Sequence, residues 1–376
     1  IFIFSKGNRI TDKSRTTRCI ANNHLRINTI NSILSISICS SSNNTTPYSI
    51  GLISNSWEGF WYSKGGTFNL ALFRILFAIC LFFEVGLTLP EGVFAIEGSF
   101  HLPYLGFVRL VTSETYALIH LLQVPFVLLL GLGLFSRFSC SALLVLQGYV
   151  FFADQLNFRN HPYFFLLVLF LLLFSPADDA LSIKSIFRAL KNRQPMTASL
   201  LGSQQLLTFQ RLIQVQVCIV YLYAAFQKLN FGYLSGAVLE YYMRDEFLRG
   251  RAGKFLEAVL SESTLFSLMD FLHNGQTFMV ISLLSLILEF GLPLALWFRK
   301  TRPFALILGI GFHIGLYVAM DVLSFSLAMI AAYLLFLEPE TLVSRLRPIL
   351  LRDRPEGEQQ SAKRIAQSVR TREENP

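Results

Sequence analysis

The sequence predicts an all-α polytopic membrane protein of about eight transmembrane helices. Only 15% of the 376 residues are charged and 53% are hydrophobic, whereas soluble domains carry about a quarter charged residues. Apolar runs near or above the length that crosses about 30 Å of hydrocarbon recur along the chain. Basic residues lie in short clusters between these runs, as in membrane proteins whose orientation is set by their loops.

The apolar runs place eight spans in chain order, each expected to be one helix. Their ranges are about 68–90, 115–135, 138–153, 163–176, 205–226, 276–298, 303–320 and 322–338. The third, fourth and last spans are short, so these helices need tilt or local thinning of the bilayer.

The basic clusters between the spans all fall on one side of the predicted membrane. They are Arg137; Lys184, Arg188, Lys191 and Arg193; Arg299, Lys300 and Arg302; and Arg345, Arg347, Arg352 and Arg354. This side, with both termini, is predicted to be cytoplasmic. The opposite loops carry Glu91, Glu97, Glu114, Asp154, His161 and Asp321. Topology therefore accounts for the net charge of +8, and no nucleic-acid partner is expected.

Polar segments flank the transmembrane domain, which is expected to span residues 57–340. Residues 1–56 are low in complexity, Ser-rich and basic, a composition that fits either a transit peptide or a leader without function. The stretch 227–275 carries apolar residues at helical spacing, which predicts helices lying on or dipping into the non-cytoplasmic membrane surface. The polar tail 341–376 is expected to be disordered and cytoplasmic.

The five cysteines are scattered and form no CxxC pair, so the sequence predicts neither a disulfide framework nor a metal site. They are Cys19, Cys39, Cys80, Cys140 and Cys218.

Polar side chains inside the spans are the first candidates for a functional site. In the fifth span Gln214, Tyr221 and Lys228 recur at steps of seven, so they share one helix face with Gln210. This stripe fits an interhelical hydrogen-bond seam with a lysine at the membrane edge, or the wall of a binding site.

The sixth and seventh spans add further candidates. Ser282, Ser285 and Glu289 follow helical spacing, and Glu289 needs a partner. His313 lies near mid-membrane, where a buried structural histidine is favoured over a functional one. His120 and Gln123 are weaker candidates. A last group, Arg74 and Glu84, lies in the first span ten residues apart, about 15 Å along a helix, so the two cannot pair directly.

The loop before the fourth span places His161 on the same predicted face as Lys228. The motif Asn160-His161-Pro162-Tyr163, and the run Tyr221-Leu222-Tyr223-Ala224-Ala225-Phe226-Gln227-Lys228-Leu229 followed by Gly236, resemble the membrane half of vitamin K-dependent gamma-carboxylase. The wider resemblance is to the HTTM (horizontally transferred transmembrane) domain family. It covers about residues 68 to 340 and includes Leu239-Glu240-Tyr241, Phe312-His313 and Phe325-Ser326.

The resemblance implies a lyase that forms a carbon–carbon bond, with Lys228 and His161 as catalytic residues. Lys228 would deprotonate a vitamin K hydroquinone-type quinol, the product of its reaction with O2 would remove a γ-proton from a glutamate side chain, and CO2 would add. His161 would stabilise the carbanion step. Tyr221, Gln214, Glu289 and His313 are candidates for holding the quinol. A lysine acts as a base only when it is neutral, and burial favours that form.

The resemblance also indicates the expected partners and leaves alternative functions open. The carboxylase has a long soluble region after its membrane half, so a peptide or a separate soluble partner is expected beside the lipid bilayer and the quinone. Two other functions stay open: a non-catalytic membrane protein or transporter that retains the fold, and a quinol-dependent oxygenase without CO2 fixation. Lys228→Ala is expected to abolish quinol-dependent oxygen consumption while leaving the fold intact.

Overall fold

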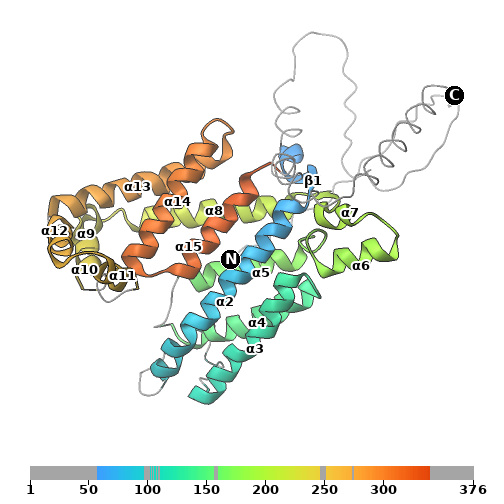
Figure 1. Ribbon diagram of the computed structural model, residues 1–376, viewed down its shortest axis with the longest axis horizontal. Coiled ribbons are helices and arrows are strands. Elements are labelled where there is room, and N and C mark those ends of the chain that lie inside the picture. The colour runs from blue at the N-terminus through green and yellow to red at the C-terminus, as the bar shows by residue number, and fades with distance from the viewer. Residues whose placement is uncertain are drawn as a thin grey trace, which may run out of the picture. The chain divides into compact units, whose positions relative to one another are not determined.

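The computed structural model describes residues 57–96, 102, 104, 106, 108, 111–155, 160–245, 251–272 and 275–338. Eight apolar helices dominate this part of the chain (Figure 1). They are α2 (Phe68–Ile96), α3 (Ser113–Leu132), α4 (Ser136–Ala153), α5 (Asn160–Phe174), α8 (Thr208–Gln227), α13 (Gly275–Trp297), α14 (Arg302–Met320) and α15 (Leu323–Ala332), which continues as the 3-10 helix η1 (Tyr333–Phe336).

The predicted all-α membrane fold is confirmed. Six of the helices in the described chain are long and apolar enough to cross a membrane, and α5 and the Leu323–Phe336 segment are shorter. Two details differ from expectation. The first helix continues to Ile96, and the fifth begins only at Thr208, because Gln204–Leu206 forms a short strand that pairs antiparallel with Lys64–Gly66. The leader 1–56 and the tail 341–376 lie outside the described residues.

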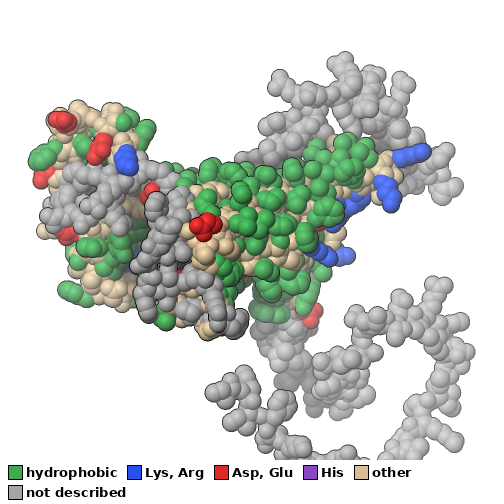
Figure 2. All heavy atoms as spheres, turned by 90° about the horizontal axis from the view of Figure 1, so that it is seen from below, with side chains coloured by type: hydrophobic (Ala, Val, Ile, Leu, Met, Phe, Trp, Pro, Cys, Tyr) green, Lys and Arg blue, Asp and Glu red, His purple; other side chains and the backbone are tan. Residues whose placement is uncertain are grey.

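The helices bury an aromatic and aliphatic core and expose apolar side chains on their outer faces. Phe73, Phe77 and Phe165 are fully buried between α2 and α5. By contrast, Val145 is 72% exposed and Phe304 is 70% exposed. Figure 2 shows hydrophobic side chains covering the middle of the face that it displays. Large apolar side chains on the outside of long helices are expected where lipid is the solvent.

Short helices lie at the two ends of the long ones (Figure 1). Two of them follow α5, namely α6 (Ile183–Lys191) and α7 (Met196–Leu201). Four lie at the other end and are α9 (Phe231–Leu234), α10 (Ala237–Asp245), α11 (Arg251–Val259) and α12 (Glu262–Leu272). The stretch 227–275 is therefore helical, as expected.

Arg74 holds the segment before α6 against the end of α3. Its guanidinium donates to the carbonyls of Ala177 (3.2 Å), Leu181 (2.7 Å) and Gly131 (3.3 Å). The turn after α3 passes so close that a Cβ on Gly133, at φ +67°, would lie 2.2 Å from the Arg74 Nη1 atom. Arg74 is fully buried and thus serves as an interhelical clamp, independent of Glu84.

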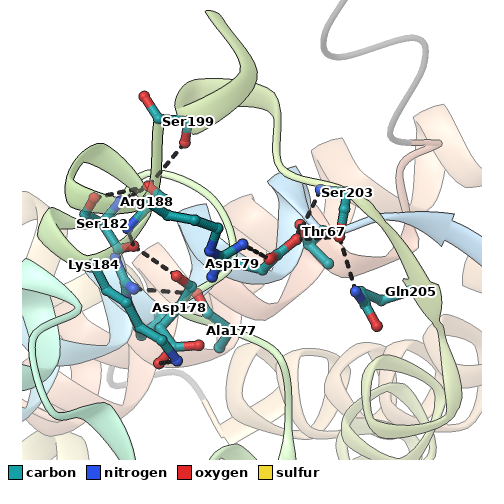
Figure 3. Close-up of polar contacts among 12 residues, drawn as sticks. Thr67, Ala177, Asp178, Asp179, Ser182, Lys184, Arg188, Ser199, Ser203 and Gln205 are labelled. Carbon is teal, nitrogen blue, oxygen red and sulfur yellow. Dashed lines mark hydrogen bonds and ion pairs between the residues drawn. The ribbon is translucent and has the colours of Figure 1, made fainter. Parts of the chain in front are cut away.

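Asp179 forms a second tie at the same end of the molecule (Figure 3). Its carboxylate accepts hydrogen bonds from the backbone N–H and hydroxyl of Ser203, at 2.7 and 2.6 Å, and from Arg188 and Thr67. Burial by itself would raise the pKa of Asp179, but the hydrogen bonds from Ser203 and Arg188 outweigh it and lower the pKa below its ordinary value. The carboxylate joins α6 to the start of α2.

Carbonyls of η1 and of the residue that follows it accept hydrogen bonds from amide side chains of other helices. Gln210 and Gln214 on α8 donate to the carbonyl of Leu335 at 2.7 and 2.6 Å. Asn69 donates to the carbonyls of Leu334 and Leu337. Helix ends leave unpaired carbonyls, which are costly in lipid. One part of the predicted polar stripe on α8 therefore serves as an interhelical seam.

Candidate functional site

The first element of the site is an ion pair between Lys228 and Glu289. Lys228 is the C-cap residue of α8, and its Nζ lies 2.5 Å from Oε1 of Glu289 on α13. The Glu289 side chain is 3% exposed and that of Lys228 is 21% exposed. Oε2 of Glu289 has no hydrogen-bond partner among the described residues. Glu289 thus has the partner that its position in a span requires.

Lys228 lies in the wall of an apolar cavity of about 320 Å3. The cavity is lined by residues from the end of α8, from α9 and α10, and from α13 and α14, most of them apolar. They are Lys228, Tyr233, Leu239, Phe278, Ile281, Leu284, Ser285, Leu288, Phe312, Gly315, Leu316, Val318, Ala319 and Met320. Such a volume and lining are typical of small-molecule sites, in which a few polar groups orient an apolar ligand.

The short helices after α8 are packed closely onto α13 and close one side of this cavity. The hydroxyls of Tyr233 and Ser285 lie 2.6 Å apart, and Lys228 Nζ is 5.2 Å from the centre of the Tyr233 ring. Gly236 has φ +85°, and a Cβ there would lie 2.5 Å from the backbone nitrogen of Met279. Only glycine meets both conditions, so Gly236 fixes the approach of this loop to α13.

A second group of polar side chains is buried deeper along α8. The Tyr221 hydroxyl lies 2.6 Å from Nε2 of His313 on α14 and also hydrogen-bonds the Tyr333 hydroxyl. Tyr333 fits because Gly309 has no side chain, since a Cβ there would lie 2.2 Å from the Tyr333 oxygen. Nδ1 of His313 is buried without a hydrogen-bond partner among the described residues.

A third group surrounds His161. Its Nε2 lies 3.9 Å from Oε1 of Glu84, and the Ser324 hydroxyl donates to Oε2 of the same carboxylate. The ring of Phe325 connects this group to the second one. Its centre is 6.3 Å from that of His161 and 5.9 Å from that of His313. Contacts therefore run from His161 through Phe325 and His313 to Tyr221, on the helix that carries Lys228.

Comparison with protein families shows to which family the chain belongs. The model of the HTTM domain matches residues 62–340, which include every long helix described above. The chain belongs to the HTTM domain family. No solved structure matches this chain.

Within the HTTM domain, the site residues predicted from the sequence lie in separate groups. Lys228 pairs with Glu289, and His161 lies beside Glu84 and is not among the described residues that line the Lys228 cavity. The resemblance assigns Lys228 and His161 to one reaction, so a pocket shared by the two residues is expected, and it stays a prediction. Both ends of the Gln214 amide are bonded, to Leu335 and Arg211, so this residue is the least available for a ligand.

The weaker candidates, His120 and Gln123 on α3, are buried within the protein. His120 is buried and contacts the carbonyl of Tyr116 through Nδ1 at 3.1 Å, and its Nε2 lies 3.4 Å from the Thr88 hydroxyl. Gln123 is buried, and its Nε2 has no partner among the described residues. Cys80, Cys140 and Cys218 are buried free thiols, while Cys19 and Cys39 lie outside the described residues.

Sequence reasoning missed the partners of His161 and Tyr221. Glu84 places a charge inside a span, but nothing along the chain links it to His161 or to Ser324, 240 residues away. Tyr333 lies within an apolar run, where an aromatic residue has no distinguishing pattern. The motif Phe325-Ser326, next to Ser324, was the available signal.

Proposed function

We propose that this HTTM domain protein is a quinol-dependent membrane enzyme of the carboxylase type. It would couple oxygenation of a vitamin K hydroquinone-type quinol to carboxylation of a glutamate side chain. The observation that carries the proposal is the ion pair between Glu289 and Lys228, whose lysine lines the apolar cavity. A proton acceptor beside an apolar chamber between membrane helices matches what a lipid-soluble quinol requires.

The cavity fits the chemistry of such a quinol. Its apolar lining from α13 and α14 suits an aromatic ring and a hydrocarbon tail, and a ligand between membrane helices can be exchanged with the bilayer. Lys228, Tyr233 and Ser285 supply the polar groups for the ring oxygens. When bound, the quinol supplies the reaction with O2 that yields a strong base.

The ion pair determines how Lys228 acts. An ammonium cannot accept a proton, so an ammonium at Lys228 must first give up a proton, and Oε1 of Glu289 is placed to accept it. We propose that the pair works as one base: Lys228 passes its proton to Oε1 of Glu289 and takes the quinol O–H proton on Nζ. The pair then holds one additional proton, and the oxygen anion of the quinol lies beside a new ammonium. Protons and charge balance in this step, because the ammonium of Lys228 is regenerated and Glu289 becomes neutral.

His161 is proposed to stabilise negative charge in the carboxylation step. The imidazole of His161 would supply an N–H donor to the developing charge, and its Nε2 lies 3.9 Å from Oε1 of Glu84. The glutamate side chain would come from a peptide or from a separate soluble partner. A transporter would need polar groups open to its cargo, whereas Gln210, Gln214 and Tyr221 are bonded within the protein, which supports the enzyme over a ligand pathway.

The test uses the purified full chain in nanodiscs with reduced vitamin K, O2, labelled bicarbonate and a glutamate-containing peptide. Quinol-dependent oxygen consumption, epoxide and labelled peptide are expected from the unchanged protein, and none from Lys228→Ala. A small exogenous amine should restore part of the activity. Lys184→Ala, which removes an ion-paired lysine at the other end of the molecule, is the matched control and should stay active. Absence of oxygen consumption by the unchanged protein would contradict the proposal, and consumption without labelled peptide would favour an oxygenase.

A further inference from the structure

The helix α6 presents three different faces. Ser185 and Ala189, four residues apart, are buried against the protein. Phe187 and Leu190, three residues apart, are 63% and 60% exposed. A third face is basic and is formed by Lys184, Arg188 and Lys191, at steps of four and three. The exposed part of the helix is therefore amphipathic.

α6 is fixed where the long helices end. The residue before its N-cap, Leu181, is held by Arg74 against the end of α3. The N-cap Ser182 and Ser185 form a capping box, and the Ser185 hydroxyl donates to the carbonyl of Ser199 at 3.0 Å. The helix therefore cannot move far from the plane in which the long helices end. The distribution of basic loops predicts that this plane is the cytoplasmic surface of the membrane.

The basic residues of α6 divide into bonded and available ones. Lys184 is paired with Asp178 at 2.7 Å and Arg188 with Asp179, which orients the helix (Figure 3). Lys191, in the last turn, and Arg193, two residues later, are exposed and have no acidic partner among the described residues. Figure 2 shows Lys and Arg side chains gathered at the end of the molecule where Figure 1 places α6.

We propose that α6 is an interfacial helix that binds anionic phospholipid headgroups, with Phe187 and Leu190 in the acyl boundary and Lys191 and Arg193 on the phosphate groups. An apolar face beside a basic one, held at the membrane surface, is the arrangement that binds anionic lipid. Both faces are needed for this specificity. Phe187 and Leu190 alone would bind any lipid, and Lys191 and Arg193 alone would bind any anion. The proposal does not depend on the enzymatic activity.

The experiment titrates the purified, delipidated full chain with phosphatidylglycerol or phosphatidylcholine and counts bound lipid by native mass spectrometry. Tighter binding of phosphatidylglycerol is expected. Lys191→Gln with Arg193→Gln should weaken that binding about tenfold or more and leave phosphatidylcholine unchanged. Phe187→Ser with Leu190→Ser should weaken both lipids. All four residues are exposed, so the fold should persist, which a melting curve in phosphatidylcholine checks.

The matched control is Arg299→Gln with Lys300→Gln, which removes two exposed basic residues from the turn after α13, on the same predicted membrane side. This variant should keep its preference for phosphatidylglycerol. The proposal is overturned if the unchanged protein binds the two lipids equally, if the Lys191 and Arg193 variant keeps its affinity, or if the control loses as much.

Discussion

Removing the charge of Lys228 should lower the free energy of unfolding more than removing the charge of Glu289. Breaking a fully buried pair costs about 3–5 kcal/mol, because one charge is left unpaired. Lys228→Met strands a carboxylate that is 3% exposed and whose second oxygen has no partner among the described residues, so a cost of about 2–3 kcal/mol is expected once proton uptake relieves part of the penalty. Glu289→Gln leaves an amine that is 21% exposed and can reach water, which should cost about 1 kcal/mol.

Equilibrium unfolding in SDS–detergent mixtures measures these changes in the free energy of unfolding. The double variant, which has no stranded charge, should be more stable than Lys228→Met. The matched cycle uses Lys184→Met and Asp178→Asn, a pair 2.7 Å apart whose lysine side chain is 51% exposed, and each change there should cost less than about 1 kcal/mol. A Lys228→Met cost no larger than that of Lys184→Met, or a double variant less stable than both single ones, would refute the reasoning.

Three further predictions concern the loop, the pH dependence and the topology. Gly236→Ala should loosen α9 and α10 from α13, cost about 1–3 kcal/mol and speed proteolysis between residues 231 and 272, whereas Gly232→Ala, whose Cβ meets nothing closer than 3.4 Å, should behave like the unchanged protein. Asp179 has a lowered pKa in the folded state, so its stabilising contribution is present above about pH 4 and is lost as the pH falls through the folded value. The stability difference between the unchanged protein and Asp179→Asn should therefore shrink in acid, and a difference that grows there would contradict the assignment. Single cysteines at the exposed positions Asn192 and Ser263 should react with an impermeant reagent from opposite sides of sealed vesicles, and labelling from the same side would overturn the topology.

The fold could be predicted from the sequence because each span is a local property. An apolar run of sufficient length must form a helix in lipid, and its ends are marked by loop residues, so the eight spans matched the observed helices within a few residues. The start of α8 was placed too early because the short strand Gln204–Leu206 depends on a partner at Lys64–Gly66. Three residues carry no local pattern that distinguishes a strand from a helix start.

The sequence could predict which residues belong to the candidate site but not which of them contact each other. Spacing placed Tyr221 and Lys228 on one helix face, and the cost of charge in a membrane marked Glu289 and Glu84. Which helices are neighbours is not written in a linear pattern, so neither Glu289 as the partner of Lys228 nor Glu84 as that of His161 could be deduced. The expectation that Lys228→Ala leaves the fold intact treats Lys228 as an isolated amine, and it stays a prediction. The ion pair with Glu289 leads us to expect a loss of stability as well.

The most direct test of the account compares epoxide formation by the unchanged protein and by Lys228→Arg in the presence of reduced vitamin K and O2. Arginine keeps the positive charge beside Glu289 and so preserves the ion pair, but its guanidinium stays protonated and cannot hand a proton to the carboxylate. The account predicts a folded protein that forms no epoxide. Epoxide formation at the unchanged rate by Lys228→Arg would show that Lys228 is not the base.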